Sequence, residues 1–219
     1  MDNVKRQELC PTLSRVSPVI IYIIIMLKCI ILQSTSSIYL FICFFLIIGS
    51  NWMFKNAIAK PLYKLLNKLT LPILGSGERP KGAHSCAFTL DNKISISYGM
   101  PSCHSQIAWT VATYIICKII NNFYNNQNTN ETNNNDIIIY NYIWLLLSCI
   151  IVLCLAIYIS YSRVYIEGCH TIQQVIVGGL IGIGCGFIIY YFENDAIKLL
   201  SNLSKTQVYK TQVYKNTSL

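Results

Sequence analysis

Residues 137–160 read IIIYNYIWLLLSCIIVLCLAIYIS and contain no charged side chain. An apolar run of this length is typical of a helix that crosses a bilayer. Of the 219 residues in the chain, 53% are hydrophobic and 12% are charged, about half the charged share of a soluble domain. The sequence therefore predicts an all-α, multi-pass transmembrane helix bundle of about five spans, with the others at 17–33, 37–54, 105–121 and 171–192.

Polar segments lie at both ends of this apolar region. We expect a polar, basic N-terminal tail at 1–16, a membrane-embedded domain at 17–193 and a polar C-terminal tail at 194–219. The formal net charge is +8, but the lysines and arginines lie mostly beside apolar runs. We interpret them as topology signals and phosphate ligands, so the expected partner is the membrane and not nucleic acid.

Three connecting segments and one glycine-rich span give further expectations. The turn STSS at 34–37 leaves room only for a tight hairpin between the first two spans. Residues 55–70 carry leucines at helical spacing, which fits either an amphipathic interfacial helix or an extension of the preceding span. The Asn-rich stretch at 121–135 is predicted to be disordered. Five glycines in the last span predict close approach of a neighbouring helix: Gly178, Gly179, Gly182, Gly184 and Gly186.

Three short polar stretches carry the residues suited to chemistry. They read GERPKGA at 77–83, GMPSCHSQ at 99–106 and YSRVYIEGCHTIQQ at 161–174. Five spans would place the segments 55–104 and 161–170 on the same side of the bilayer, so the three stretches can converge. The prediction is therefore an active-site loop at the membrane interface.

Cationic and hydroxyl groups in these stretches match the needs of a phosphate. Arg79 and Arg163 offer planar, permanently charged forks, and Lys81 adds a point charge. Ser102 comes just before a span, where the N–H groups of a helix start favour anions. It is a candidate N-cap or a direct phosphate donor. Phosphate hydrolysis requires such donors for the nonbridging oxygens.

Two of the three histidines, His104 and His170, lie where spans begin at this face. One neutral imidazole can attack phosphorus while the other, protonated, gives a proton to the leaving oxygen. Histidine suits both tasks because its ordinary pKa lies near working pH. The third, His84, is interpreted as a loop residue. The residues alone leave open which histidine has which role.

Together these stretches resemble the phosphatidic acid phosphatase type 2 superfamily, and within it the dolichyl diphosphatase branch. The family motifs are Lys-x6-Arg-Pro, Pro-Ser-Gly-His and Ser-Arg-x5-His-x3-Asp. The resemblance covers roughly residues 40–192. The matching positions are Arg79-Pro80, Pro101-Ser102-Cys103-His104, and Ser162-Arg163 with His170.

The resemblance implies a role for each matching residue. His170 would be the nucleophile that forms a phosphohistidine, and His104 would be the general acid. The family uses no metal or other cofactor. The phosphoryl oxygens would be held by Arg79, Ser102, the backbone amide of Cys103, and Arg163.

The first two motifs are incomplete in this chain. Pro72 stands seven residues before Arg79, where the family has its lysine, and Lys68 or Lys81 is a candidate substitute. Cys103 replaces the glycine of the second motif, which is tolerable if the backbone there need not adopt a positive φ.

The third motif also differs. Six residues, where the family has five, separate Arg163 from His170, and a loop at Glu167-Gly168 can absorb the extra one. Gln174 takes the place of the aspartate, as it does in the dolichyl branch. A neutral amide can still orient the His170 ring, although it supports an imidazolium less well.

The expected function is hydrolysis of a lipid-linked phosphate or diphosphate by an integral membrane enzyme. Polyprenyl or dolichyl diphosphate is the favoured substrate, and the endoplasmic reticulum or another internal membrane is the expected location. The alternatives are a phosphatidate or lysophospholipid phosphatase and a catalytically inactive membrane scaffold of the same fold. The side of the membrane stays open, because the basic segments favour a cytosolic site while the resemblance implies a lumenal one.

Two alternatives concern cysteines beside the histidines. Cys103-His104 and Cys169-His170 offer the donors of a Cys2His2 zinc site, although adjacent ligands suit one tetrahedral ion poorly and the arginines would repel it. A disulfide between Cys103 and Cys169 is the other, if the site faces an oxidising compartment.

Overall fold

The computed structural model describes residues 2–32, 34–65, 77–83, 98–129 and 135–217. Every regular element within these residues is helical, which confirms the predicted all-α class. The elements are α1 (Asp2–Leu32), α2 (Thr35–Met53), the π-helical segment η1 (Phe54–Ala59), α3 (Lys60–Leu65), α4 (Cys103–Thr129), α5 (Asn135–Tyr161), the π-helical segment η2 (Ser162–Ile166) and α6 (Ile172–Thr217).

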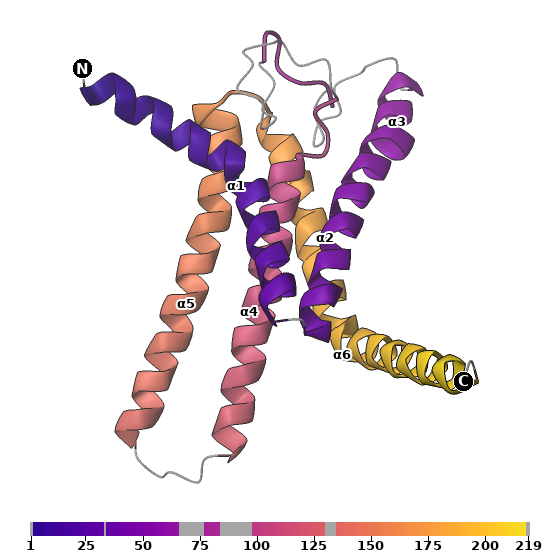
Figure 1. The fold of residues 1–219 in the computed structure, drawn as a ribbon. Coiled ribbons are helices and arrows are strands. Elements are labelled where there is room, and N and C mark those ends of the chain that lie inside the picture. The colour runs from indigo at the N-terminus through magenta and orange to yellow at the C-terminus, as the bar shows by residue number, and fades with distance from the viewer. Residues whose placement is uncertain (1, 33, 66–76, 84–97, 130–134, 218–219) are drawn as a thin grey trace.

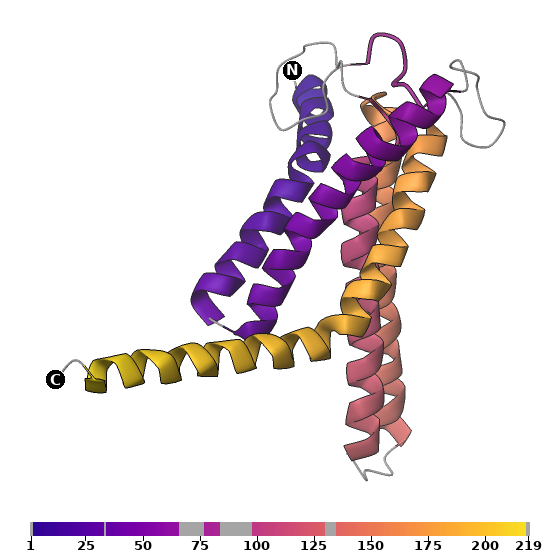
Figure 2. The ribbon, with the colours of Figure 1, turned by 90° about the vertical axis from the view of Figure 1, so that its right-hand side faces the viewer.

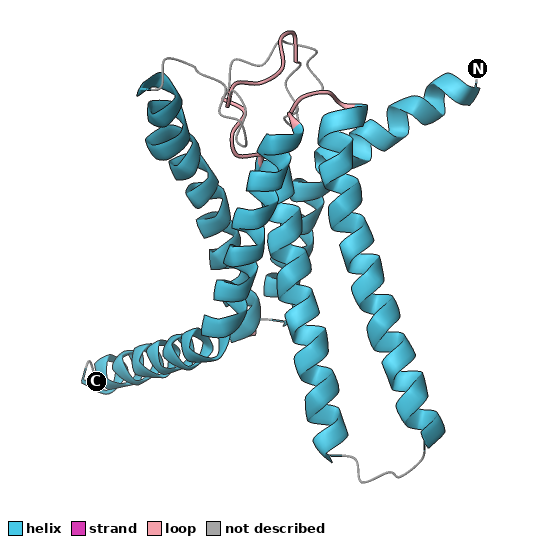
Figure 3. Ribbon diagram, turned by 180° about the vertical axis from the view of Figure 1, so that it is seen from behind, coloured by secondary structure: helices cyan, strands magenta, loops and turns pink. Residues whose placement is uncertain are grey.

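The long helices alternate in direction. In Figure 1, α1, α4 and α6 begin at one end of the bundle, and α2 and α5 begin at the other. The described loop segments before α4 and α6 therefore lie at the end of the bundle where α1 begins (Figure 3). The stretches 77–83, 99–106 and 161–174 meet there, as predicted from the number of spans.

Within the described residues, four helical stretches are long and apolar enough to cross a membrane: Arg15–Leu32, Thr35–Leu65, Asn141–Ile166 and Ile172–Leu203. The central helix α4 is more polar, and the polar side chains of its first part face the protein. Gln106 Nε2 donates to Ser50 Oγ at 3.0 Å, and Asn51 Nδ2 donates to Gln106 Oε1 at 2.7 Å. A helix surrounded by other helices need not be apolar, so α4 completes the multi-pass bundle.

The outer surface of the bundle is apolar. Leu146, Ile151 and Leu155 on α5 are each more than half exposed. An exposed apolar surface of this extent would drive association in water, so it is the surface expected to contact lipid. The hydrophobic core lies inside, where Phe44 and Ile47 of α2 pack with Ile107 of α4.

Some helix boundaries differ from the predicted ones, and one decides between two predicted alternatives. α2, η1 and α3 form one helical stretch to Leu65, so the part of 55–70 that is described extends the preceding span. The segment predicted to be disordered at 121–135 is helical up to Thr129 and again from Asn135, because α4 and α5 extend past their apolar parts. The tight hairpin is confirmed, since Ser34 Oγ accepts from the Ser37 N–H and caps α2.

The last helix, α6, has two parts. Its first part packs against α4, and its C-terminal part turns away from the bundle (Figure 2). In the first part a Cβ at Gly178 would lie 2.5 Å from the Ser102 carbonyl oxygen, and one at Gly182 would meet the Gln106 carbonyl oxygen. The predicted close approach is confirmed at these positions but not at Gly184, which has nothing within 4 Å.

This difference predicts opposite effects of two alanine substitutions. Gly182→Ala is expected to destabilise the protein by about 1–3 kcal/mol, because the methyl group overpacks the helix contact. Gly184→Ala is the matched control and should stabilise by up to about 1 kcal/mol through helix propensity. Thermal unfolding in detergent measures both, and equal effects would contradict the close contact.

Candidate active site

The His170 ring is buried and held in one orientation. Its Nδ1 lies 3.0 Å from Oε1 of Gln174, and the Thr171 N–H donates to the same oxygen at 3.3 Å. Gln174 Nε2 donates to the Glu78 carbonyl at 2.6 Å, so its oxygen must face the ring. The neutral imidazole therefore carries its proton on Nδ1, and the lone pair lies on Nε2.

Two glycines fix the loops around this amide. A Cβ at Gly99 would lie 2.5 Å from Gln174 Oε1, so only glycine leaves room for the side chain. The N–H groups of Gly99 and Met100 donate to the Gly77 carbonyl at 3.2 and 3.1 Å. Gly77 has a φ of 66°, which favours glycine. These bonds join the stretch GERPKGA to the start of α4.

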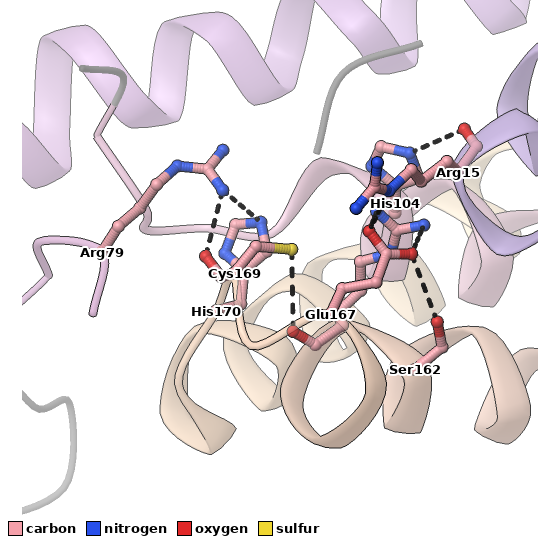
Figure 4. Close-up of polar contacts among 8 residues, drawn as sticks. Arg15, Arg79, His104, Ser162, Glu167, Cys169 and His170 are labelled. Atoms are coloured by element: carbon pink, nitrogen blue, oxygen red, sulfur yellow. Dashed lines mark hydrogen bonds and ion pairs between the residues drawn. The ribbon is translucent and has the colours of Figure 1, made fainter. Parts of the chain in front are cut away.

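Arg79 lies beside the reactive nitrogen of His170. Its Nη1 donates to the Cys169 carbonyl at 3.0 Å and lies 3.4 Å from His170 Nε2 (Figure 4). Burial, followed by the charge of Arg79, lowers the pKa of His170 well below its ordinary value of 6.5. The imidazole is thus kept neutral next to a cation that can also bind a phosphate oxygen.

A second charged cluster surrounds His104. Arg163 is fully buried, and its Nη2 lies 3.1 Å from Glu167 Oε1. Arg15 of α1 donates from Nε to Glu167 Oε2 at 2.8 Å, and the Arg15 carbonyl lies 3.2 Å from His104 Nε2. Figure 4 shows this cluster on one side and Arg79 with His170 on the other. Sequence reasoning assigned no role to Arg15, because nothing in a polar N-terminal segment indicates such a contact.

The start of α4 supplies further donors. The Ser102 N–H donates to the Gln174 carbonyl at 3.0 Å, which joins α4 to α6. The Ser102 hydroxyl is buried and has no hydrogen-bond partner among the described residues. Cys103 begins the helix, and the N–H groups of a first helical turn lack intrahelical acceptors. A buried hydroxyl of this kind marks a place where a ligand can bind.

Lys55, like Arg15, is a residue that sequence reasoning missed. It lies in η1, partly buried, and its charge interacts with that of Arg79 and contributes to the lowered pKa of His170. Lys55 lies 24 residues before Arg79. The lysine of the family motif lies seven residues before its arginine, so the motif spacing does not indicate Lys55. Of the two predicted substitutes, Lys81 is exposed and Lys68 lies outside the described residues.

The cysteine alternatives are both wrong. Cys103 has a free thiol, whereas Cys169 is disulfide-bonded, so the two are not joined to each other. A disulfide sulfur is not a thiolate and cannot complete a Cys2His2 zinc site. His84 lies outside the described residues, so its interpretation as a loop residue stays a prediction.

Comparisons with known proteins identify the family of the chain. The family model described as the PAP2 superfamily matches residues 73–198. Dolichyldiphosphatase 1 of Homo sapiens is 30% identical over 134 residues, which is 61% of this chain and 43% of the human protein. The proteins of that name from Callithrix jacchus and Plecturocebus moloch match with the same identity and coverage. The match thus spans less than half the length of these relatives. No solved structure matches the chain.

Proposed function

Because the chain belongs to the PAP2 superfamily, we propose that it is an integral membrane hydrolase that releases phosphate from a lipid-linked phosphate or diphosphate. A polyprenyl diphosphate such as dolichyl diphosphate is the favoured substrate, in line with the names of the relatives. The main support for the proposal is the position of the His170 ring: its unprotonated Nε2 lies 3.4 Å from Arg79 Nη1. The endoplasmic reticulum or another internal membrane is the proposed location.

In the first step, the His170 Nε2 lone pair attacks the terminal phosphorus. The bond from phosphorus to the leaving oxygen breaks, and that oxygen takes a proton from the His104 imidazolium. The product is a phosphohistidine, and the lipid departs with its oxygen protonated. Arg79, Arg163 and the Ser102 hydroxyl stabilise the charge on the phosphoryl oxygens, together with the N–H groups that begin α4.

In the second step, water attacks the phosphohistidine. His104, now neutral, accepts a proton from the water, and the bond from phosphorus to Nε2 breaks to release inorganic phosphate. Gln174 holds the His170 ring through Nδ1 in both steps. Apart from the substrate and this water, the steps use the side chains and backbone amides of the chain itself.

A substrate panel tests the proposal against its alternatives. The purified protein is incubated with dolichyl diphosphate, dolichyl phosphate, phosphatidate and lysophosphatidate, and inorganic phosphate release is measured. Preference for the diphosphate is expected. Preference for phosphatidate would replace the favoured substrate, and release from none would favour the inactive scaffold. The ordered His170 ring and the buried Ser102 hydroxyl favour an enzyme over a scaffold.

Lys55 and Lys81 provide a paired prediction about the missing motif lysine. Lys55→Gln is expected to lower kcat/KM by about 10- to 100-fold, because a partly buried cation beside the phosphate pocket is lost. Lys81→Gln removes the same charge from an exposed position and should change kcat/KM less than about twofold. A larger loss in Lys81→Gln than in Lys55→Gln would show that Lys81 is the residue that replaces the motif lysine.

The pH dependence of kcat/KM follows from His170. The neutral ring is the active form, and its pKa in the empty site is lowered below 6.5, so the ring stays neutral as pH falls through 6.5. We expect the acid limb of kcat/KM for wild type to lie below pH 6.5. Arg79→Gln removes one cause of the lowering and should move the limb to higher pH. Because both enzymes use the same substrate, ionisation of the substrate cancels from this comparison.

A further inference from the structure

A buried carboxylate occupies a place that suits a phosphate. The Glu167 carboxylate is fully buried between the guanidinium groups of Arg15 and Arg163, and Arg163 Nη1 donates to its Oε2 at 3.4 Å. The Ser162 hydroxyl donates to its Oε1 at 3.5 Å. Arginine forks bind carboxylate and phosphate with the same geometry. The chain thus holds one of its own anions between two groups that bind phosphate oxygens.

The cluster of Arg15, Arg163 and Glu167 lies on the side of the site where the leaving group is expected. His170 and Arg79 lie on one side of the site, and His104, Arg15 and Glu167 lie on the other (Figure 4). In phosphoryl transfer the attacking and leaving atoms are roughly in line on opposite sides of phosphorus. An attack from His170 therefore directs the leaving oxygen toward His104. In a lipid diphosphate, this oxygen belongs to the phosphate that stays on the lipid.

The charge of the described pocket also suits a diphosphate. Its cations are Lys55 and Arg79 beside His170, and Arg15 and Arg163 beside His104, with Glu167 as the buried anion. The net charge is +3 when both imidazoles are neutral, and +4 when His104 carries the proton that it gives to the leaving oxygen. A phosphate monoester carries about −1.5 to −2 at neutral pH, and a second phosphate adds about one more negative charge. A lipid diphosphate therefore balances the pocket more closely than a monophosphate does.

We propose that Arg15 extends the site to a second phosphate subsite, which holds the lipid-attached phosphate of a diphosphate substrate, and that Arg163 lies between the two phosphates and contacts both. In the free protein the Glu167 carboxylate occupies this subsite, and the substrate phosphate takes its place between the guanidinium groups. A lipid monophosphate has nothing to place there, so Arg15 is a specificity-determining residue for diphosphates. This inference rests on the proposed function and adds to it a residue outside the family motifs.

The test compares two substrates with the same polyprenyl chain, one a diphosphate and one a monophosphate. The full-length protein in detergent is measured as wild type, Arg15→Gln and Arg15→Lys. Lys28→Gln is the matched control, since it removes one positive charge from the same helix thirteen residues further on. We expect Arg15→Gln to reduce the ratio of kcat/KM for diphosphate over monophosphate by about 10- to 100-fold. Lys28→Gln should leave the ratio unchanged.

A binding measurement keeps the test independent of turnover. Inhibition constants are determined for inorganic diphosphate and inorganic phosphate, and Arg15→Gln should lose most of the preference for diphosphate. If Arg15→Gln does not fold, Arg15→Lys, which keeps the charge but not the fork, should show a smaller loss in the same direction. Equal losses with both substrates, or an unchanged ratio in the folded variant, would overturn the second subsite. Absence of release from either substrate by wild type would instead overturn the proposed function.

Discussion

His170→Ala is expected to lower kcat for phosphate release by about 10⁴-fold or more, as loss of a covalent nucleophile does in other enzymes. The physical reason is that Gln174 and the Glu78 carbonyl hold this imidazole in place, with its free lone pair beside Arg79. The measurement is rapid quenching with a substrate labelled in its terminal phosphate. Wild type should form an acid-labile phosphoprotein, and His170→Ala should form none.

His104→Ala serves as the companion variant. It removes the proton donor but leaves the nucleophile, so we expect a loss of about 10²- to 10⁴-fold. A substrate with a good leaving group needs no proton on the leaving oxygen, and it should still label His170 in this variant. Labelled phosphoprotein in His170→Ala would refute the role of His170 as nucleophile. If labelling is lost in His104→Ala and kept in His170→Ala, the two roles are reversed.

Arg79→Gln is expected to lower kcat by about 10²- to 10³-fold, in the range measured when one preorganised transition-state donor is removed. The Arg79 guanidinium lies next to the attacking nitrogen, His170 Nε2. It is therefore close to the phosphoryl group, where negative charge develops in the transition state. Steady-state kinetics across substrate concentration separates this effect from binding. The loss should fall mainly on kcat, because the contact is strongest in the transition state.

Arg79→Lys controls for charge alone. Lysine keeps the positive charge but not the fork that reaches both the Cys169 carbonyl and the phosphate, so it should recover only part of the activity. Thermal unfolding of both variants shows whether loss of the contact between Arg79 and the Cys169 carbonyl also destabilises the protein. A folded Arg79→Gln variant with wild-type kcat would contradict the proposed role of this guanidinium.

Much of the fold and site could be predicted because the relevant signals are local in sequence. Apolar runs gave the spans, and the short motifs around Arg79, Ser102 and Arg163 indicated a phosphate site. The two histidines were predicted to share one face of the membrane, and the helix directions place them there (Figure 1). Between Arg163 and His170 the π-helical segment η2 ends at Ile166 and a loop follows, where Gly168 has a φ of 59°, so this stretch is not one continuous α-helix.

Other features could not be predicted because their signals are not local. Lys55 lies in a helix far from Arg79 in sequence, and only the folded structure brings the two charges close enough to interact. Arg15 lies in a segment whose composition indicates only a polar tail. The span at 105–121 was predicted, but the hydrogen bonds from Gln106 of α4 to Ser50 and Asn51 were not.

The sequence by itself determined that this protein is a bundle of membrane-crossing helices with three polar motifs at one face, because hydrophobicity and short-range spacing are properties of the chain alone. Only the tertiary structure decided which cations surround the imidazoles and which nitrogen of His170 is free. Those features depend on hydrogen bonds between groups distant in sequence, such as Gln174 with the Glu78 carbonyl and Arg15 with Glu167. Such contacts exist only after the helices have packed.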